Sequence, residues 1–121
     1  MKKYSTSHEW IMLEKEVGVV GVSDHAQKEL GEVVYVELPE VGKEIKQGEE
    51  VAVIESTKAA ADVYAPTSGT VVAVNHLLVD SPEKINQDAE GEGWLFKLEV
   101  RDLSLIENLM ESSAYSAMIE G

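Results

Sequence analysis

The sequence predicts a mainly β protein of two small sheets, with a short helix in its N-terminal half and a helix near its C-terminus. Short valine-rich runs alternate with turns that contain glycine or proline, which is the pattern of β-strands. One motif occurs twice, as GEVVYV at residues 31–36 and GTVVAV at residues 69–74. An isolated isoleucine and a further strand follow each copy, so we expect two similar sheets packed face to face.

The first third of the chain predicts a hairpin followed by the short helix. Residues 9–13 and 17–22 are apolar enough for two strands, and the polar residues 14–16 form the turn between them. Ser23 or Asp24 is expected to cap a helix over residues 25–30, which Gly31 ends. A helix this short has little stability of its own, so it must be held by packing.

The middle of the chain predicts a series of short strands. These cover residues 33–38, 51–54, 63–66 and 70–74, with Ile45 as a lone apolar anchor before the second. Residues 77–79 are expected to form another short strand, and residues 81–84 the cap and first turn of a brief helix. After a break at residues 91–93, the last strand is expected over residues 94–100.

Near the end of the chain, the spacing of apolar residues changes from that of strands to that of a helix. Apolar residues recur at helical spacing from Leu103 to Met110, which predicts one amphipathic helix capped by Asp102 or Ser104. Ser112 is expected to end this helix, and the tail over residues 114–121 is expected either to dock or to fray.

Length, charge and composition narrow the class of protein. A chain of 121 residues predicts one domain, residues 1–121, and a net charge of −13 argues against binding to nucleic acid or anionic membranes. High net charge also favours a monomer. The absence of cysteine, of a signal peptide and of any apolar run long enough to cross a membrane fits a cytoplasmic protein.

The segment ESTKAAAD at residues 55–62 carries the one unusual chemical feature of the chain. Strand-like residues lead into it and out of it, so Lys58 is expected at a hairpin tip with only small neighbours. An exposed ammonium is a poor nucleophile, but its mobile stem is accessible to a modifying enzyme. This predicts a covalent swinging arm on Lys58, whereas the ordinary alternative is a solvated surface charge.

The other reactive side chains do not form a recognisable catalytic motif. His8, His25 and His76 are far apart in the sequence and lack the spacing of metal ligands, so each is expected to be a surface or packed histidine. No nucleophile motif surrounds a serine, and the chain has no thiol. We therefore expect a carrier protein with no metal and no catalytic residue of its own.

Residues 55–69 resemble the lipoylation segment of the glycine cleavage system H protein family. Further matches are SHEW at residues 7–10, GVSDHAQ at 21–27, LGE at 30–32, VELP at 36–39, VN at 74–75 and GW at 93–94. They fall in the family's order and extend over nearly the whole chain. Thr57 and Ala61 stand where the family often has valine and serine, and Ala89-Glu90 replaces a frequent Pro-Tyr pair, which could alter a docking surface.

The resemblance implies a barrel-sandwich hybrid with a lipoyl hairpin, in which Lys58 is amidated by lipoic acid. Such a carrier takes an aminomethyl group from glycine decarboxylase (P protein) to the aminomethyltransferase (T protein), and dihydrolipoyl dehydrogenase (L protein) then reoxidises the arm. A lipoate-attaching enzyme is a further implied partner. The resemblance also implies recognition or cleft residues at Ser7, Glu9, Glu55 and Asp62, of which Ser7, Glu9 and Asp62 would accept hydrogen bonds from the cationic cargo.

Three other interpretations stay open. An H-like carrier could relay lipoate to other lipoyl domains. A biotinyl or dehydrogenase-type lipoyl domain is the second, but biotinyl hairpins place methionines beside the lysine, where this chain has Thr57 and Ala59. Dehydrogenase-type lipoyl domains lack the His-Glu-Trp start and the C-terminal helix. The third is a structural β protein whose Lys58 is never modified, and whose Glu9 and Asp62 are ordinary solvated acids.

Overall fold

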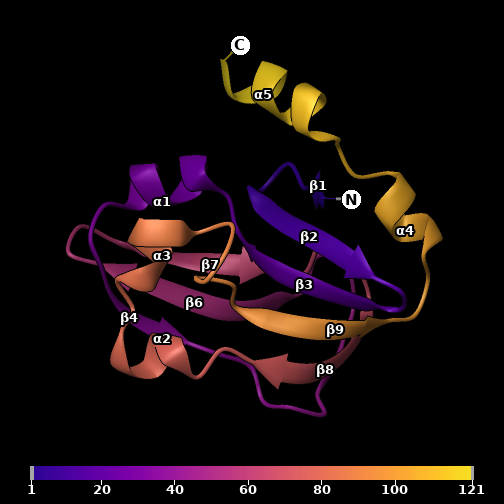
Figure 1. Ribbon diagram of the computed structural model, residues 1–121, viewed down its shortest axis with the longest axis horizontal. Coiled ribbons are helices and arrows are strands. Elements are labelled where there is room, and N and C mark those ends of the chain that lie inside the picture. The colour runs from indigo at the N-terminus through magenta and orange to yellow at the C-terminus, as the bar shows by residue number, and fades with distance from the viewer. Residues whose placement is uncertain (1, 121) are drawn as a thin grey trace.

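Two antiparallel sheets enclose the core of the protein, shown in Figure 1 as a computed structural model that describes residues 2–120. The larger sheet has the order β1-β2-β3-β9-β8-β5 and the smaller has the order β4-β6-β7. The strands are β1 (Lys2–Tyr4), β2 (Glu9–Glu14), β3 (Val17–Val22), β4 (Val33–Glu37), β5 (Glu44–Ile45), β6 (Glu50–Ser56), β7 (Ala60–Tyr64), β8 (Gly69–Val74) and β9 (Phe96–Val100). The helices are α1 (Asp24–Leu30), α2 (Leu77–Asp80), α3 (Lys84–Asp88), α4 (Ser104–Glu107) and α5 (Ser112–Glu120).

The internal repeat forms one strand pair in each sheet, as expected. The first copy gives β4, which pairs with β6, and the second gives β8, which pairs with β9. The isoleucines that follow the two copies, Ile45 and Ile85, are both buried in the core that the sheets share. Phe96 and Leu98 of the larger sheet join the same core as Ile54 and Val63 of the smaller one, so the two sheets are packed face to face.

The helix signals in the first third are confirmed. Ser23 caps α1 by accepting a hydrogen bond on its side-chain oxygen from the Ala26 amide at 3.1 Å. Gly31 ends the helix with φ of 82°, a left-handed conformation that glycine adopts without steric cost. The expected hairpin of residues 9–13 and 17–22 is the pair β2–β3.

Three predictions between residues 60 and 96 are wrong. The strand after the lysine turn begins at Ala60 rather than residue 63, because pairing with β6 outweighs the weak strand propensity of alanine. Residues 77–79 belong to helix α2, whose first amide is held by the Asn75 side chain at 3.2 Å. The last strand begins at Phe96 rather than residue 94. The brief helix expected from residues 81–84 is present as α3, and these residues form the turn that leads into it.

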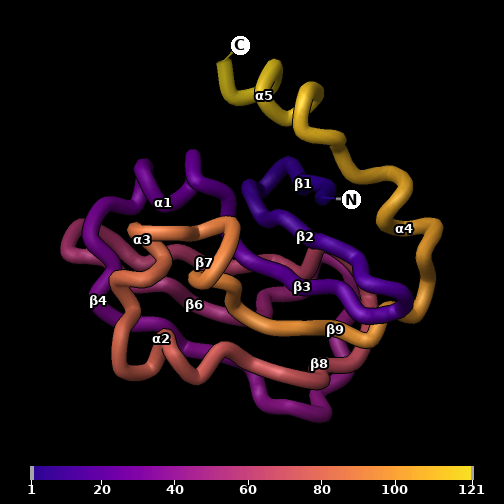
Figure 2. The backbone as a smooth tube through the Cα atoms, viewed as in Figure 1, coloured from indigo at the N-terminus to yellow at the C-terminus, as the bar shows by residue number. Residues whose placement is uncertain are grey.

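The expected single helix near the C-terminus is two helices. Met110 is extended and exchanges two backbone hydrogen bonds of 2.8 Å with Tyr4, which interrupts the helical run. Ser112 therefore begins α5 instead of ending a helix. Strand β1, which the sequence did not indicate, supplies the pairing partner. Figure 2 shows α5 lying beyond β1, outside the two sheets.

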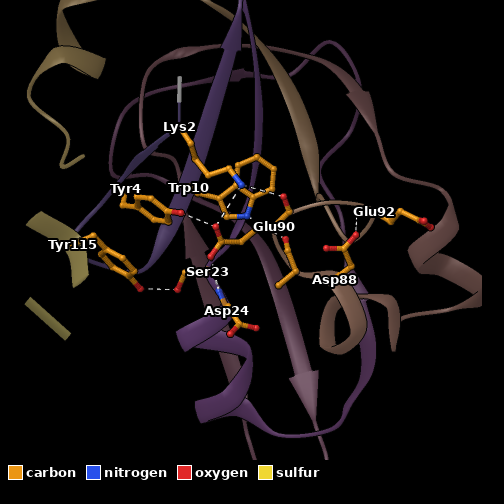
Figure 3. A network of polar contacts seen from close by, with 10 residues as sticks. Lys2, Tyr4, Trp10, Ser23, Asp24, Asp88, Glu90, Glu92 and Tyr115 are labelled. Carbon is orange, nitrogen blue, oxygen red and sulfur yellow. Dashed lines mark hydrogen bonds and ion pairs between the residues drawn. The ribbon is translucent and has the colours of Figure 1, made fainter. Parts of the chain in front are cut away.

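Tyr115 docks α5 on the rest of the molecule. Its ring stacks on Tyr4 with 4.5 Å between the centroids, and its hydroxyl lies 2.6 Å from Ser23 Oγ and 2.7 Å from His8 Nδ1. Burial raises the pKa of the Tyr115 hydroxyl, so this group stays neutral. The contact joins α5 to both β1 and the cap of α1 (Figure 3).

The Ala89-Glu90 pair takes part in the same region. The Glu90 carboxylate accepts hydrogen bonds from the Tyr4 hydroxyl at 2.6 Å and the Asp24 amide at 2.9 Å, and the Ala89 carbonyl accepts one from Trp10 Nε1 at 3.1 Å (Figure 3). The Ala89-Glu90 pair is therefore held by contacts within the chain. No helix within residues 2–120 has the length and apolar character needed to cross a membrane.

We expect Tyr115→Phe to keep the aromatic stack and to weaken the docking of α5, because Ser23 and His8 lose their shared partner. Loss of one hydrogen bond's contribution should speed amide hydrogen exchange within α5 by about tenfold. Tyr35→Phe is the matched control, since Tyr35 is 53% exposed on β4. Equal exchange in both variants would show that the Tyr115 hydroxyl does not hold α5.

Candidate functional site

Lys58 lies exposed in the turn between β6 and β7, as the sequence predicts. The Ser56 side chain shapes this turn, because its oxygen accepts hydrogen bonds from the amides of Lys58 at 3.2 Å and Ala59 at 3.1 Å. The Ser56 amide closes the turn by donating to the Ala59 carbonyl at 2.8 Å. The backbone is thus fixed by its own hydrogen bonds, while the lysine side chain is accessible for modification.

The lysine turn also rests on the connection between α1 and β4. The Thr57 amide donates to the Glu32 carbonyl at 3.0 Å. A Cβ atom placed on Gly31 would lie 3.1 Å from Lys58 Cε and 3.7 Å from Nζ, so the lysine stem passes close over this glycine. The turn therefore projects at the end of the molecule where α1 and α3 lie (Figure 1).

A cavity of about 250 Å³, called the cleft from here on, opens between α1, strand β7 and the start of β2. Half of the residues in its walls are apolar, and the others carry carboxyl, hydroxyl or imidazole groups. The lining residues are Ser7, His8, Glu9, Val22, His25, Ala26, Glu29, Leu30, Ile54, Ala61, Asp62 and Val63. An apolar pocket with a few convergent polar groups is the usual form of a small-ligand site.

Glu9 is a buried carboxyl in the wall of the cleft, only 2% exposed. One oxygen accepts hydrogen bonds from the hydroxyls of Ser5 and Ser7, each at 2.5 Å, and the other accepts one from the Tyr64 amide at 3.1 Å. Burial raises the pKa of the Glu9 carboxyl, and these hydrogen bonds partly offset the effect. The ordinary alternative of a solvated surface acid is therefore wrong for Glu9.

The other residues expected at the site divide into two groups. Ser7 and Asp62 line the cleft together with Glu9, and Asp62 is exposed on β7, the edge strand of the smaller sheet. Glu55 is exposed on β6 and is not among the residues that line the cleft. The structure thus brings three of the four residues together around one cavity.

His8 and His25 are residues of the cleft that the sequence analysis set aside. Their rings lie 5.0 Å apart although the residues are distant in the chain, and both are half-buried, in agreement with the expectation of packed histidines. Burial lowers the pKa of His8, and the nearby His25 lowers it further. His8 also has φ of 73°, which is unusual for a residue with a side chain. Within residues 2–120 there is no group of three or more metal-ligating side chains.

Comparison with known proteins gives a consistent result. A family model described as glycine cleavage H-protein matches residues 2–121. The glycine cleavage system H protein of Thermotoga maritima is 59% identical over 115 residues, which cover 95% of this chain and 93% of that protein. The corresponding protein of Shewanella loihica is 53% identical over 119 residues, covering 98% and 92%.

The fold agrees with these sequence matches. A crystal structure of a glycine cleavage system H protein from Mycobacterium marinum matches with a TM-score of 0.91 and 34% identity, covering 99% of this chain and 97% of that one. The two packed sheets with their lysine hairpin are the barrel-sandwich hybrid that the family resemblance implies. The chain belongs to the glycine cleavage H-protein family.

Proposed function

We propose that this chain is the lipoyl carrier of a glycine cleavage system, with lipoic acid attached through an amide bond to Lys58. The observation that carries the proposal is an exposed lysine on a fixed turn, beside an apolar cleft that contains a buried carboxyl. One domain spanning residues 1–121 performs this role as a carrier and not as an enzyme. The proposed cargo is the aminomethyl group of glycine.

The residues of the cleft fit the chemistry of such an arm. When attached, lipoic acid supplies a dithiolane that accepts the aminomethyl group after glycine is decarboxylated. Val22, Leu30 and Ile54 offer apolar surface to the hydrocarbon part of the arm and exclude water from it. Asp62 and Ser7 offer oxygen acceptors to the ammonium of the cargo.

Glu9 would take the central place among these acceptors. Its carboxyl is held by two serine hydroxyls and a backbone amide, so it is oriented before any ligand arrives. Because burial raises its pKa, an adjacent cation would stabilise its ionised form more than it would stabilise a solvated carboxylate. Glu55 is exposed on the hairpin outside the cleft, so its proposed role is recognition by the lipoate-attaching enzyme and not contact with the cargo.

The proposed partners are the other components of the system. These are glycine decarboxylase, the aminomethyltransferase, dihydrolipoyl dehydrogenase and a lipoate-attaching enzyme. The net charge of −13 would favour encounter with basic docking faces on such partners. Relay of lipoate to other lipoyl domains remains the second candidate function, since it uses the same exposed Lys58.

We expect Lys58→Ala to fold normally and to lose all glycine cleavage when combined with the three enzyme partners. The side chain is exposed, so the free energy of unfolding should change by no more than about 0.5 kcal/mol. Lys46→Ala is the matched control, because Lys46 is another exposed turn lysine that lies away from the cleft. Retained cleavage activity in Lys58→Ala would contradict the proposal, and an unfolded variant would contradict the exposed turn.

We expect Asp62→Asn to hasten loss of the aminomethyl group from the loaded protein, because the cation loses a carboxylate partner. A partly exposed charge pair of this kind should change the decay rate by about two- to fivefold. Decay can be followed by intact mass over time. Glu50→Gln, on the same hairpin but outside the cleft, should decay at the parent rate, and equal rates in the two variants would remove Asp62 from the site.

A further inference from the structure

The position of the lysine turn depends on a short segment from another part of the chain. Residues 31–33 join α1 to β4, and the Glu32 carbonyl accepts the Thr57 amide at 3.0 Å. Gly31 lies directly beneath the Lys58 stem, where a Cβ atom would stand 3.1 Å from Cε. Residues 31–33 are called the platform from here on. A shift of the platform would therefore move both the backbone of the turn and the base of the lysine side chain.

One amide side chain fixes the platform at both of its ends. Asn86 Nδ2 donates to the Gly31 carbonyl at 2.8 Å, and Asn86 Oδ1 accepts the Val33 amide at 2.9 Å. The same Nδ2 group donates to Gln27 Oε1 at 3.0 Å, which ties the side chain to α1 as well. Both hydrogens and the oxygen of the amide are used, so its orientation is determined by its partners.

Asn86 is itself held rigidly in helix α3. The preceding residue, Ile85, is fully buried in the core, and α3 packs beside α1 (Figure 1). Asn86 is neither a cleft residue nor in contact with the Lys58 side chain through any of its hydrogen bonds. Its hydrogen bonds reach the lysine turn through the platform.

We propose that Asn86 is a positioning residue that holds the Lys58 turn in the geometry that a lipoate-attaching enzyme recognises. The order of contacts is Asn86 to Gly31 and Val33, then the Glu32 carbonyl to the Thr57 amide, then Lys58. The part of this inference that concerns attachment rests on the proposed function, whereas the part that concerns the turn does not. Without Asn86 the turn is ordered in only a fraction of molecules, and the apparent affinity of the lipoate-attaching enzyme for the chain falls in proportion to that fraction.

The test compares Asn86→Ala with a matched control, Asn75→Ala. Asn75 is also an amide that makes three hydrogen bonds, to the Glu92 and Trp94 carbonyls and the Leu77 amide, but none of its partners belongs to the platform. It is only 7% exposed, so its loss should cost at least as much global stability as the loss of half-buried Asn86. Any effect specific to Asn86 is then separate from general destabilisation.

Two readouts are made on the unmodified full-length chain. The first is amide hydrogen exchange at Thr57, which we expect to be about tenfold faster in Asn86→Ala and unchanged in Asn75→Ala. The second is steady-state lipoate attachment, in which KM for the chain should rise by a similar factor in Asn86→Ala while kcat is kept. Asn86→Asp keeps the acceptor for Val33 but turns a carboxylate toward the Gly31 carbonyl, so it should change both readouts in the same direction.

Equal Thr57 exchange in Asn86→Ala and the parent would overturn the inference, as would the same acceleration in Asn75→Ala. A fall in kcat with unchanged KM would likewise contradict a positioning role before binding. If the parent chain is not modified on Lys58, the proposed function fails, and the exchange measurement still decides whether Asn86 holds the turn.

Discussion

The buried carboxyl of Glu9 is the interaction on which the cleft depends, because it joins the larger sheet to the edge strand of the smaller one. Glu9 begins β2 in the larger sheet, and its side chain accepts the Tyr64 amide from β7 at the edge of the smaller one. Two serine hydroxyls donate to its other oxygen. A buried carboxyl without such partners would be costly, so Ser5, Ser7 and Tyr64 are parts of one arrangement.

The site combines a fixed backbone around Lys58 with a lysine side chain that is exposed to solvent. The hydrogen bonds of Ser56 and Thr57 fix the backbone around Lys58. The cleft lies along the same hairpin: its residue Asp62 is four residues beyond the lysine, which is at most about 14 Å of extended chain. A carrier needs both properties. Enzymes must find the attachment point in a constant geometry, and the attached arm must reach either a partner enzyme or the cleft.

Local signals were sufficient for the parts of the fold that local interactions determine. The Ser23 cap, the Gly31 stop and the valine-rich strands could be identified because each acts within a few residues. The errors occur where distant residues decide the structure. Residues 77–80 are helical because the Asn75 side chain, tied to the Glu92 and Trp94 carbonyls, also holds the first amide of α2. Met110 leaves the helical run because it pairs with Tyr4 at the other end of the chain.

The site shows the same division. Lys58 could be identified from its small neighbours, and the family resemblance indicated Ser7, Glu9 and Asp62. Their convergence on one cavity, the burial of Glu9 and the pairing of His8 with His25 all require the fold. Asn86 had no sequence signal, because its role depends on the carbonyl and amide that it reaches on the platform.

The proposed role of the protein depends on a lipoyl group on Lys58. Its most direct test is intact mass with peptide mapping of the protein made in cells that can attach lipoate, beside a carrier known to be modified there. We predict a lipoyl increment confined to the peptide that contains Lys58. An unmodified Lys58 in cells that do modify the control carrier would contradict the account and leave only the shared fold.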